Sequence, residues 1–122
     1  MDILEKDEIR LLLNIGYAAC AKGKVILAKR IFDNLAVAYQ DVDAVKIGQA
    51  FSYVVVDKFD MAYEILLPLQ DSENVKDEVC ALLAFSYALE KKEEESKEYA
   101  TKVSEENPQA FALAQSALSL LS

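Results

Sequence analysis

Apolar residues recur along most of the chain at the three- and four-residue spacing of amphipathic helices, and short polar segments separate these stretches. Asp7 and Asp43 stand where an N-cap is expected for the first and third of these helices. The chain is therefore expected to be all-α. The predicted helices cover about 9–21, 25–38, 44–56, 75–89 and 108–121, with another from 59 that Pro68 shortens and a charged one from 93 to 107.

The apolar pattern also repeats itself every 34 residues without a gap. With Ile9 as position 1, position 8 and position 20 hold small residues in all three copies, and positions 24 and 27 are mostly bulky and apolar. Small side chains allow two helices to cross at close distance, so they mark where the helices of each unit are expected to meet. The small residues are Gly16, Ala50 and Ala84 at position 8, and Ala28, Ala62 and Ser96 at position 20.

This pattern resembles the tetratricopeptide repeat, in which two antiparallel helices make one unit and successive units stack. The resemblance implies three degenerate helical hairpins, about 9–42, 43–76 and 77–108, in a right-handed superhelix with a C-terminal capping helix over 108–121. The chain departs from the family by lacking Trp at position 4 and by carrying Ala100 at position 24. At 122 residues we expect one domain, 1–122. The alternative is an irregular antiparallel bundle with accidental spacing.

In this family the first helix of each unit lines a concave groove, and positions 5, 9, 12 and 13 face into it. Read in these columns, the chain gives an apolar groove throughout, which suits an amphipathic helix. At position 2, Arg10 and Glu78 place opposite charges at its two ends, which would orient a bound segment. The predicted groove residues are Leu13, Tyr17, Cys20, Ile47, Phe51, Val54, Val55, Ala81, Phe85, Ala88 and Leu89.

Two other features of the chain bear on this groove. The last helix aligns Phe111 and Leu121 on one side and either caps the third unit or folds back into the groove, as the Ile3-Leu4 lead also can. The lysines at position 16, which are Lys24, Lys58 and Lys92, favour an exposed solubilising rim over a recognition site.

The composition narrows the function classes. The net charge of −8 disfavours binding to nucleic acid and to anionic lipid surfaces. No run of about 18 apolar residues predicts membrane insertion, and the first eight residues lack the pattern of a signal peptide, so a cytoplasmic location is expected.

Candidate chemistry is sparse. Histidine is absent, which removes the commonest general base and metal ligand, so no enzyme, metal site or cofactor is expected. Asp41 and Asp43 begin a calcium-loop-like spacing, but Lys46 occupies the position that requires Gly. Cys20 and Cys80 are read as small hydrophobic residues rather than as a disulfide.

Three degenerate units, a short lead, a trailing helix, acidic charge and the apolar columns together resemble the small chaperones of bacterial type III secretion, most closely the needle-subunit chaperones. The resemblance implies a chaperone that holds the amphipathic C-terminal helix of a self-assembling needle subunit and blocks its premature polymerisation, commonly with a second small helical co-chaperone. Translocator chaperones, which usually carry a longer N-terminal arm, are the second reading. A structural adaptor with an internally filled groove is the third. Co-chaperones that grip a C-terminal carboxylate are excluded, because Leu13 and Tyr17 replace their Lys and Asn.

Overall fold

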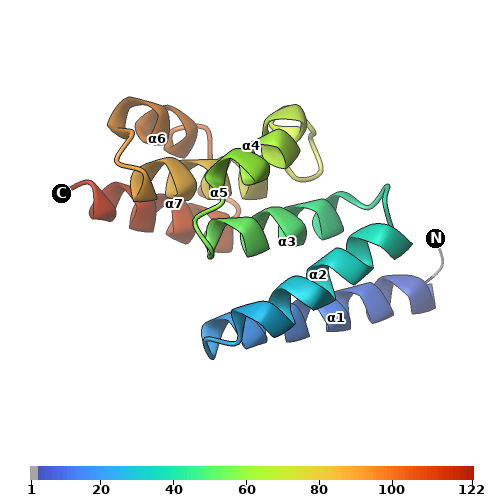
Figure 1. The fold of residues 1–122 in the computed structure, drawn as a ribbon. Coiled ribbons are helices and arrows are strands. Elements are labelled where there is room, and N and C mark those ends of the chain that lie inside the picture. Colours follow the sequence, from blue (N-terminus) through green and yellow to red (C-terminus); the bar gives the residue numbers. More distant parts are fainter. Residues whose placement is uncertain (1–2) are drawn as a thin grey trace. The chain divides into compact units, whose positions relative to one another are not determined.

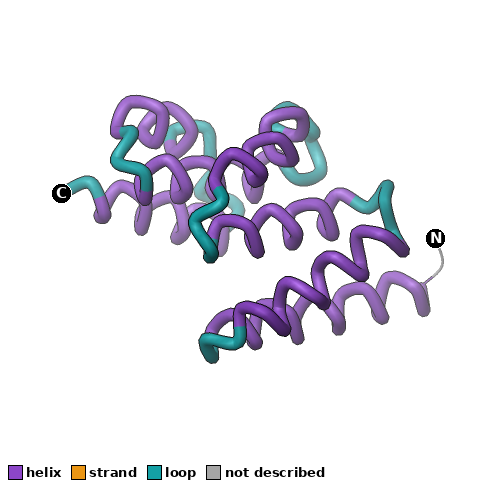
Figure 2. The backbone as a smooth tube through the Cα atoms, in the orientation of Figure 1, coloured by secondary structure: helices purple, strands orange, loops and turns teal. Residues whose placement is uncertain are grey.

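The computed structural model describes residues 3–122, with side chains from Glu5 onward, and this part of the chain contains seven α-helices, a short 3₁₀ helix and no strand (Figures 1 and 2). The predicted all-α class is confirmed. The elements are α1 (Ile3–Ala21), α2 (Val25–Ala38), α3 (Asp43–Val54), α4 (Phe59–Leu66), η1 (Leu67–Leu69), α5 (Lys76–Leu89), α6 (Glu93–Ala100) and α7 (Pro108–Leu120).

The helices group into two compact units, Met1–Ile65 and Leu66–Ser122. In the first unit α1 and α2 form a hairpin, and α3 packs against α2 and, to a smaller extent, against α1 (Figure 1). In the second unit α5 is central, with α7 packed most extensively against it and α6 on another side. Each unit is therefore organised around one helix that touches two others.

Phe32 is the centre of the first unit and is fully buried. Gly16 of α1 and Gly48 of α3 both face its ring, where a Cβ atom would lie 2.7 Å from Cζ at Gly16 and 2.8 Å from Cδ1 at Gly48. The absence of a side chain at both positions lets three helices close around one aromatic ring.

The turns between α1 and α2, between α3 and α4 and between α5 and α6 share one backbone conformation. Gly23, Asp57 and Lys91 all have positive φ, at 78°, 62° and 61°, and they stand 34 residues apart. A left-handed residue of this kind reverses the chain after a helix and satisfies its last carbonyls. The same bond closes each turn: Lys24 N–H to Ala19 O at 2.8 Å, Lys58 N–H to Tyr53 O at 2.9 Å and Lys92 N–H to Tyr87 O at 2.9 Å.

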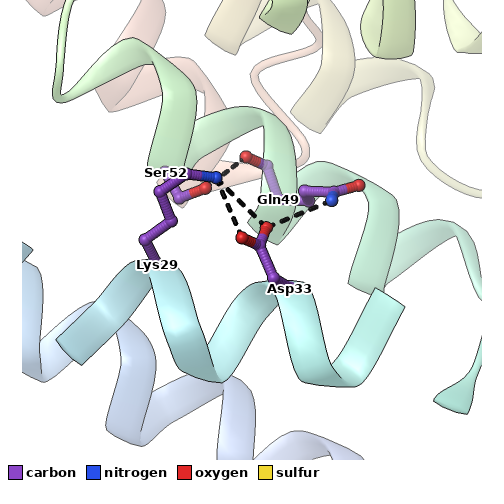
Figure 3. A network of polar contacts seen from close by, with 4 residues as sticks. All are labelled: Lys29, Asp33, Gln49 and Ser52. Atoms are coloured by element: carbon purple, nitrogen blue, oxygen red, sulfur yellow. Dashed lines mark hydrogen bonds and ion pairs between the residues drawn. The ribbon is translucent and has the colours of Figure 1, made fainter. Parts of the chain in front are cut away.

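A polar network joins α2 to α3 on one side of the first unit (Figure 3). The Lys29 Nζ donates to Asp33 Oδ2 at 2.9 Å, and Gln49 Nε2 donates to Asp33 Oδ1 at 3.2 Å. The Lys29 ammonium also lies 4.1 Å from the centre of the Tyr53 ring. Ser52 Oγ donates to the Gln49 carbonyl at 2.6 Å. These contacts fix which side of α2 faces α3.

The second unit buries α5 on most of its circumference. The ten consecutive residues from 79 to 88 are all buried or partly buried, and only Phe85 and Tyr87 among them are partly buried. Ser96 of α6 is fully buried and donates its hydroxyl to the Ala84 carbonyl of α5 at 2.7 Å. Tyr99 stacks on Tyr87 at 5.8 Å between ring centres. The fully or nearly buried residues of α5 are Val79, Cys80, Ala81, Leu82, Leu83, Ala84, Ser86 and Ala88.

Two predicted N-caps are wrong. Helix α1 already begins at Ile3, so Asp7 lies inside it, because the preceding residues continue the helix with good helix formers such as Glu5 and Lys6. Helix α3 begins at Asp43 itself, with Val42 in the capping position and no side-chain capping bond. Asp43 instead supplies a negative charge to the first turn.

The predicted length of the charged helix is also wrong. Helix α6 ends at Ala100 rather than at Asn107. The Ser104 N–H donates to Asp77 Oδ1 of α5 at 3.2 Å instead of continuing a helical ladder, and the β-branched Thr101 lowers the helix propensity of this segment. The predicted start of the last helix is confirmed, since Asn107 caps α7 by accepting a hydrogen bond from the Ala110 N–H at 3.3 Å.

Candidate partner-binding site

The first unit brings together aromatic residues from α1 and α3. The Tyr17 ring lies 5.2 Å from the Phe51 ring in an edge-on arrangement and 5.1 Å from the Phe32 ring. Tyr17 and Phe51 are the residues at position 9 of the first and second predicted 34-residue repeats. Both are partly exposed, whereas Phe32 beneath them is fully buried. The two rings therefore pack on the buried core, and their outer surfaces are accessible to solvent.

Further apolar side chains adjoin this pair along α1 and α3. Cys20 and Ile47 are partly exposed, Val55 is 37% exposed, and Leu13 is almost fully buried. Val54, which was also predicted to line the groove, is buried. We call the set Leu13, Tyr17, Cys20, Ile47, Phe51 and Val55 the α1–α3 face.

A hollow of about 290 Å³ continues the α1–α3 face toward the start of α1 and α3. It is lined by Lys6, Ile9, Arg10, Leu13, Val42 and Ala44. Its apolar wall is thus bordered by two cationic side chains, Lys6 and Arg10, which are exposed. Such a site accommodates an apolar side chain that is followed by a carboxylate.

In the second unit, fewer of the predicted groove residues are exposed than the sequence predicts. Of the four residues predicted to face the groove on α5, Phe85 is partly exposed and Leu89 is 42% exposed. Ala81 and Ala88 are buried, at 0% and 3% exposure. Small side chains on α5 suit the close approach of α7, which is α5's most extensive packing partner in this unit. The exposed stripe on this helix is therefore Glu78, Phe85 and Leu89.

Burial also sets the ionisation of the candidate side chains. It raises the pKa of Tyr17 to about 12, with a smaller contribution from Cys20. Burial raises the pKa of the Cys20 thiol and, as the largest of several effects, that of the Cys80 thiol. Both cysteines are free and protonated at neutral pH, so neither is an activated nucleophile.

The site is thus an apolar, aromatic surface beside a cationic hollow. Comparisons with protein-family models, curated proteins and solved structures found no match. Within residues 3–122, no three His, Cys, Asp or Glu side chains come together to hold a metal ion. None of the described helices has both the length and the apolar character needed to cross a bilayer.

Sequence reasoning missed several residues of this surface. Lys6, Ile9 and Val42 help to line the hollow, yet they lie outside the columns that the repeat pattern selects. Val42 lines the hollow because the α2–α3 connection passes beside α1, and a helical pattern in the sequence does not reveal this. The side chains of Ile3 and Leu4, named as a possible filling of the groove, lie outside the described residues.

Proposed function

We propose that this protein is a tetratricopeptide-like chaperone that binds an amphipathic helix of a self-assembling secreted subunit, as the needle-subunit chaperones of type III secretion do. In this proposal three helical hairpins stack in a right-handed superhelix and α7 caps the third. The observation that carries the proposal is the contact between Tyr17 and Phe51, which are the residues at position 9 of the first two predicted repeats. The left-handed turn residues at intervals of 34 give it further support.

The chemistry of the α1–α3 face suits the apolar side of a helix. Partly exposed Tyr17 and Phe51 provide rigid aromatic contact area, and helix-in-groove recognition uses anchors at i, i+3, i+4 and i+7. Burying about 800 Å² on each partner at about 25 cal/mol per Å² gives a gross gain that exceeds typical ordering costs. A subunit held in this way cannot use the same apolar side to polymerise.

The charge around the face gives a bound helix a direction. Lys6 and Arg10 are exposed and border the hollow at one end of the α1–α3 face. An acidic residue of the client is therefore placed at the hollow in this proposal. The protein works in the bacterial cytoplasm, with a second small helical co-chaperone.

A second function, a structural adaptor with a self-filled groove, is favoured by one observation. Ala81 and Ala88 are buried, and α7 packs closely on α5, so part of the predicted groove is closed within the second unit. An adaptor would dock through another surface, such as the lysines at the hairpin turns. In that case changes on the α1–α3 face would leave binding intact.

The test is a pull-down from the native host with wild type and matched variants, followed by mass spectrometry. We expect a small helical secreted protein to co-purify with the wild type, and Phe51→Glu and Val55→Glu to reduce its recovery at least ten-fold. Val37→Glu is the control, because Val37 is 74% exposed on α2 and lies outside the α1–α3 face. Circular dichroism verifies that each variant stays helical.

Client recovery that is unaffected by both face variants would refute the proposal. Loss of binding on charge reversal of Lys24, Lys58 and Lys92 instead would establish the adaptor function. If the captured client is a membrane-inserting translocator, the protein is instead assigned to the translocator chaperones.

A further inference from the structure

Helix α1 is apolar on two sides. Ile9 and Leu13 point into the core and are nearly fully buried. Leu11 and Ile15, one turn apart on the other side, are 60% and 44% exposed. Exposed aliphatic side chains in one row on a helix are typical of a contact surface. The core packing of the first unit does not account for this second row.

Helix α2 extends the exposed row into a face. Leu27 is 48% exposed, and Ile31 is partly exposed and lines a hollow of about 310 Å³. Other residues that line this hollow are Glu8, Leu12, Leu35 and Tyr39. We call this surface, with Leu11, Ile15, Leu27 and Ile31 at its centre, the outer face of the α1–α2 hairpin.

Helix α3 does not cover the outer face. Its polar contacts with α2 involve Asp33, which accepts a hydrogen bond from Gln49 (Figure 3), and Lys29, which lies over the Tyr53 ring. Leu27 and Ile31 project from a different side of α2, because two residues along a helix rotate the side chain by about 200°. The outer face is thus opposite the side on which the first unit is closed.

The charges on the outer face have a symmetric arrangement. Glu8 and Ile15 of α1 and Lys22, which directly follows the helix and still bonds through its N–H to the Ala18 carbonyl, stand at intervals of seven residues, so they lie close to one row, with Leu11 between the first two. Glu8 and Lys22 are both exposed. The ion pairs found in the described part of the chain include neither of them. The row therefore carries an unpaired acid at one end, an apolar centre and an unpaired base at the other.

We propose that the outer face binds the outer face of a second copy of this chain, with the two α1 helices antiparallel. A two-fold axis at Ile15 places Ile15 against Ile15 of the second copy. The same operation puts Glu8 opposite Lys22 at both ends, which is the self-complementarity that an isologous interface requires. A parallel arrangement would instead bring like charges together.

The dimensions of the face limit the area of this contact. Helix α1 has 19 residues, and a hairpin about 28 Å long and about 18 Å wide presents about 500 Å² per copy. This area is below the roughly 800 Å² per partner of a standard stable interface. The dimer is therefore transient, with a dissociation constant on the order of 10 to 100 µM. The client-binding α1–α3 face stays open in it, so the two proposals are independent.

Sedimentation equilibrium of the full chain tests the proposal at protein concentrations from about 10 to about 500 µM, which span the expected dissociation constant. We expect the mass to rise from 13.6 kDa toward twice that value. Ile15→Glu and Leu11→Glu should each weaken association at least ten-fold. Val37→Glu, at a still more exposed aliphatic position away from the face, should leave it unchanged.

Charge reversal tests the antiparallel pairing. Glu8→Lys and Lys22→Glu should each weaken the dimer, and the combination of both changes should restore it, because opposite charges then face each other again. Ile15→Cys in a Cys20→Ser background should form a disulfide-linked dimer under mild oxidation, whereas Val37→Cys in that background should not.

The possible outcomes separate the alternatives. A wild type that stays monomeric at about 500 µM overturns the proposal and leaves the outer face to a different protein. A dimer that survives Ile15→Glu, with a native circular dichroism spectrum, overturns it too. A dimer that responds to Ile15→Glu but is not restored by the double charge swap refutes the antiparallel arrangement.

Discussion

Gly48 of α3 faces the Phe32 ring of α2 so closely that a Cβ atom there would lie 2.8 Å from Cδ1 of the ring. Gly16 of α1 approaches the same ring at 2.7 Å. Both distances are shorter than carbon atoms tolerate, and the fully buried ring has no free space into which to move. The packing of the first three helices therefore depends on two missing side chains.

Replacement of either glycine tests this dependence. Ala in place of Gly within a helix normally stabilises by about 1 kcal/mol. We expect Gly16→Ala to destabilise instead, by about 1–2 kcal/mol in urea unfolding, because overpacking outweighs helix propensity. In a Phe32→Leu background, which removes the ring, the same change should become neutral or stabilising. A stabilising effect of Gly16→Ala in the wild type would contradict the packing described here.

The raised pKa of Tyr17 predicts a loss of stability at alkaline pH. Below about pH 10 the phenol is neutral in both the folded and the unfolded chain, and its full contribution is present. Between pH 10 and the folded pKa of about 12, the unfolded chain releases its proton first, so the free energy of unfolding falls. Two pKa units at about 1.4 kcal/mol each make this loss about 3 kcal/mol at most. Tyr17→Phe should lack this component when urea unfolding is compared at about pH 8 and about pH 11.

The left-handed turns predict substitutions that stabilise. Lys91 has a φ of 61°, which disfavours a residue with a side chain by about 1 kcal/mol. Lys91→Gly should therefore raise the free energy of unfolding by about 0.5–1 kcal/mol. Lys92→Gly is the matched control, since Lys92 has a negative φ of −90°, and it should destabilise.

Gly23 gives the reverse test in the first hairpin. Its φ is 78°, and no heavy atom lies within 4 Å of an added Cβ, so only the backbone conformation resists a side chain. Gly23→Ala should lower the free energy of unfolding by about 1 kcal/mol. An unchanged midpoint in urea would show that this turn has another conformation.

The buried hydroxyl of Ser96 links α6 to α5. Ser96→Ala should reduce stability by about 1 kcal/mol, because the Ala84 carbonyl loses a hydrogen-bond donor. Ser96→Val should reduce it further, by about 1–3 kcal/mol, because a larger side chain separates the helices. Ser119→Ala serves as the control, since that hydroxyl is exposed and bonds only to the Gln115 carbonyl of its own helix. Equal effects at Ser96 and Ser119 would be inconsistent with the buried link.

The sequence predicts most helices well because their apolar residues recur with the helical period and short polar turns separate them. The prediction fails where a side chain that is distant in the sequence determines where a helix ends. The end of α6 depends on Asp77, which binds the Ser104 N–H across 27 residues. The start of α1 at Ile3 was missed because an acidic residue, Asp7, reads as a cap even where the helix passes through it.

Only part of the candidate site can be predicted from the sequence. The repeat columns select Tyr17 and Phe51, whose rings are in contact. The same columns do not distinguish exposed from covered positions, and Ala81 and Ala88 are buried in the packing around α5. Exposure depends on which helix packs against which, and a one-dimensional pattern does not contain that information. The second apolar side of α1 is visible in the run Leu11-Leu12-Leu13, which spans more of the helix than one face.

The recurrent turns also bear on how quickly the chain acquires its structure. The turns after α1, α3 and α5 each close over a few residues, so the entropy lost on loop closure is small. Contacts between neighbouring helices form within about microseconds to milliseconds in proteins dominated by local pairing. A newly synthesised chain can therefore complete its first hairpin while the ribosome is still adding the later ones, which shortens the time for which its aliphatic side chains meet other nascent proteins.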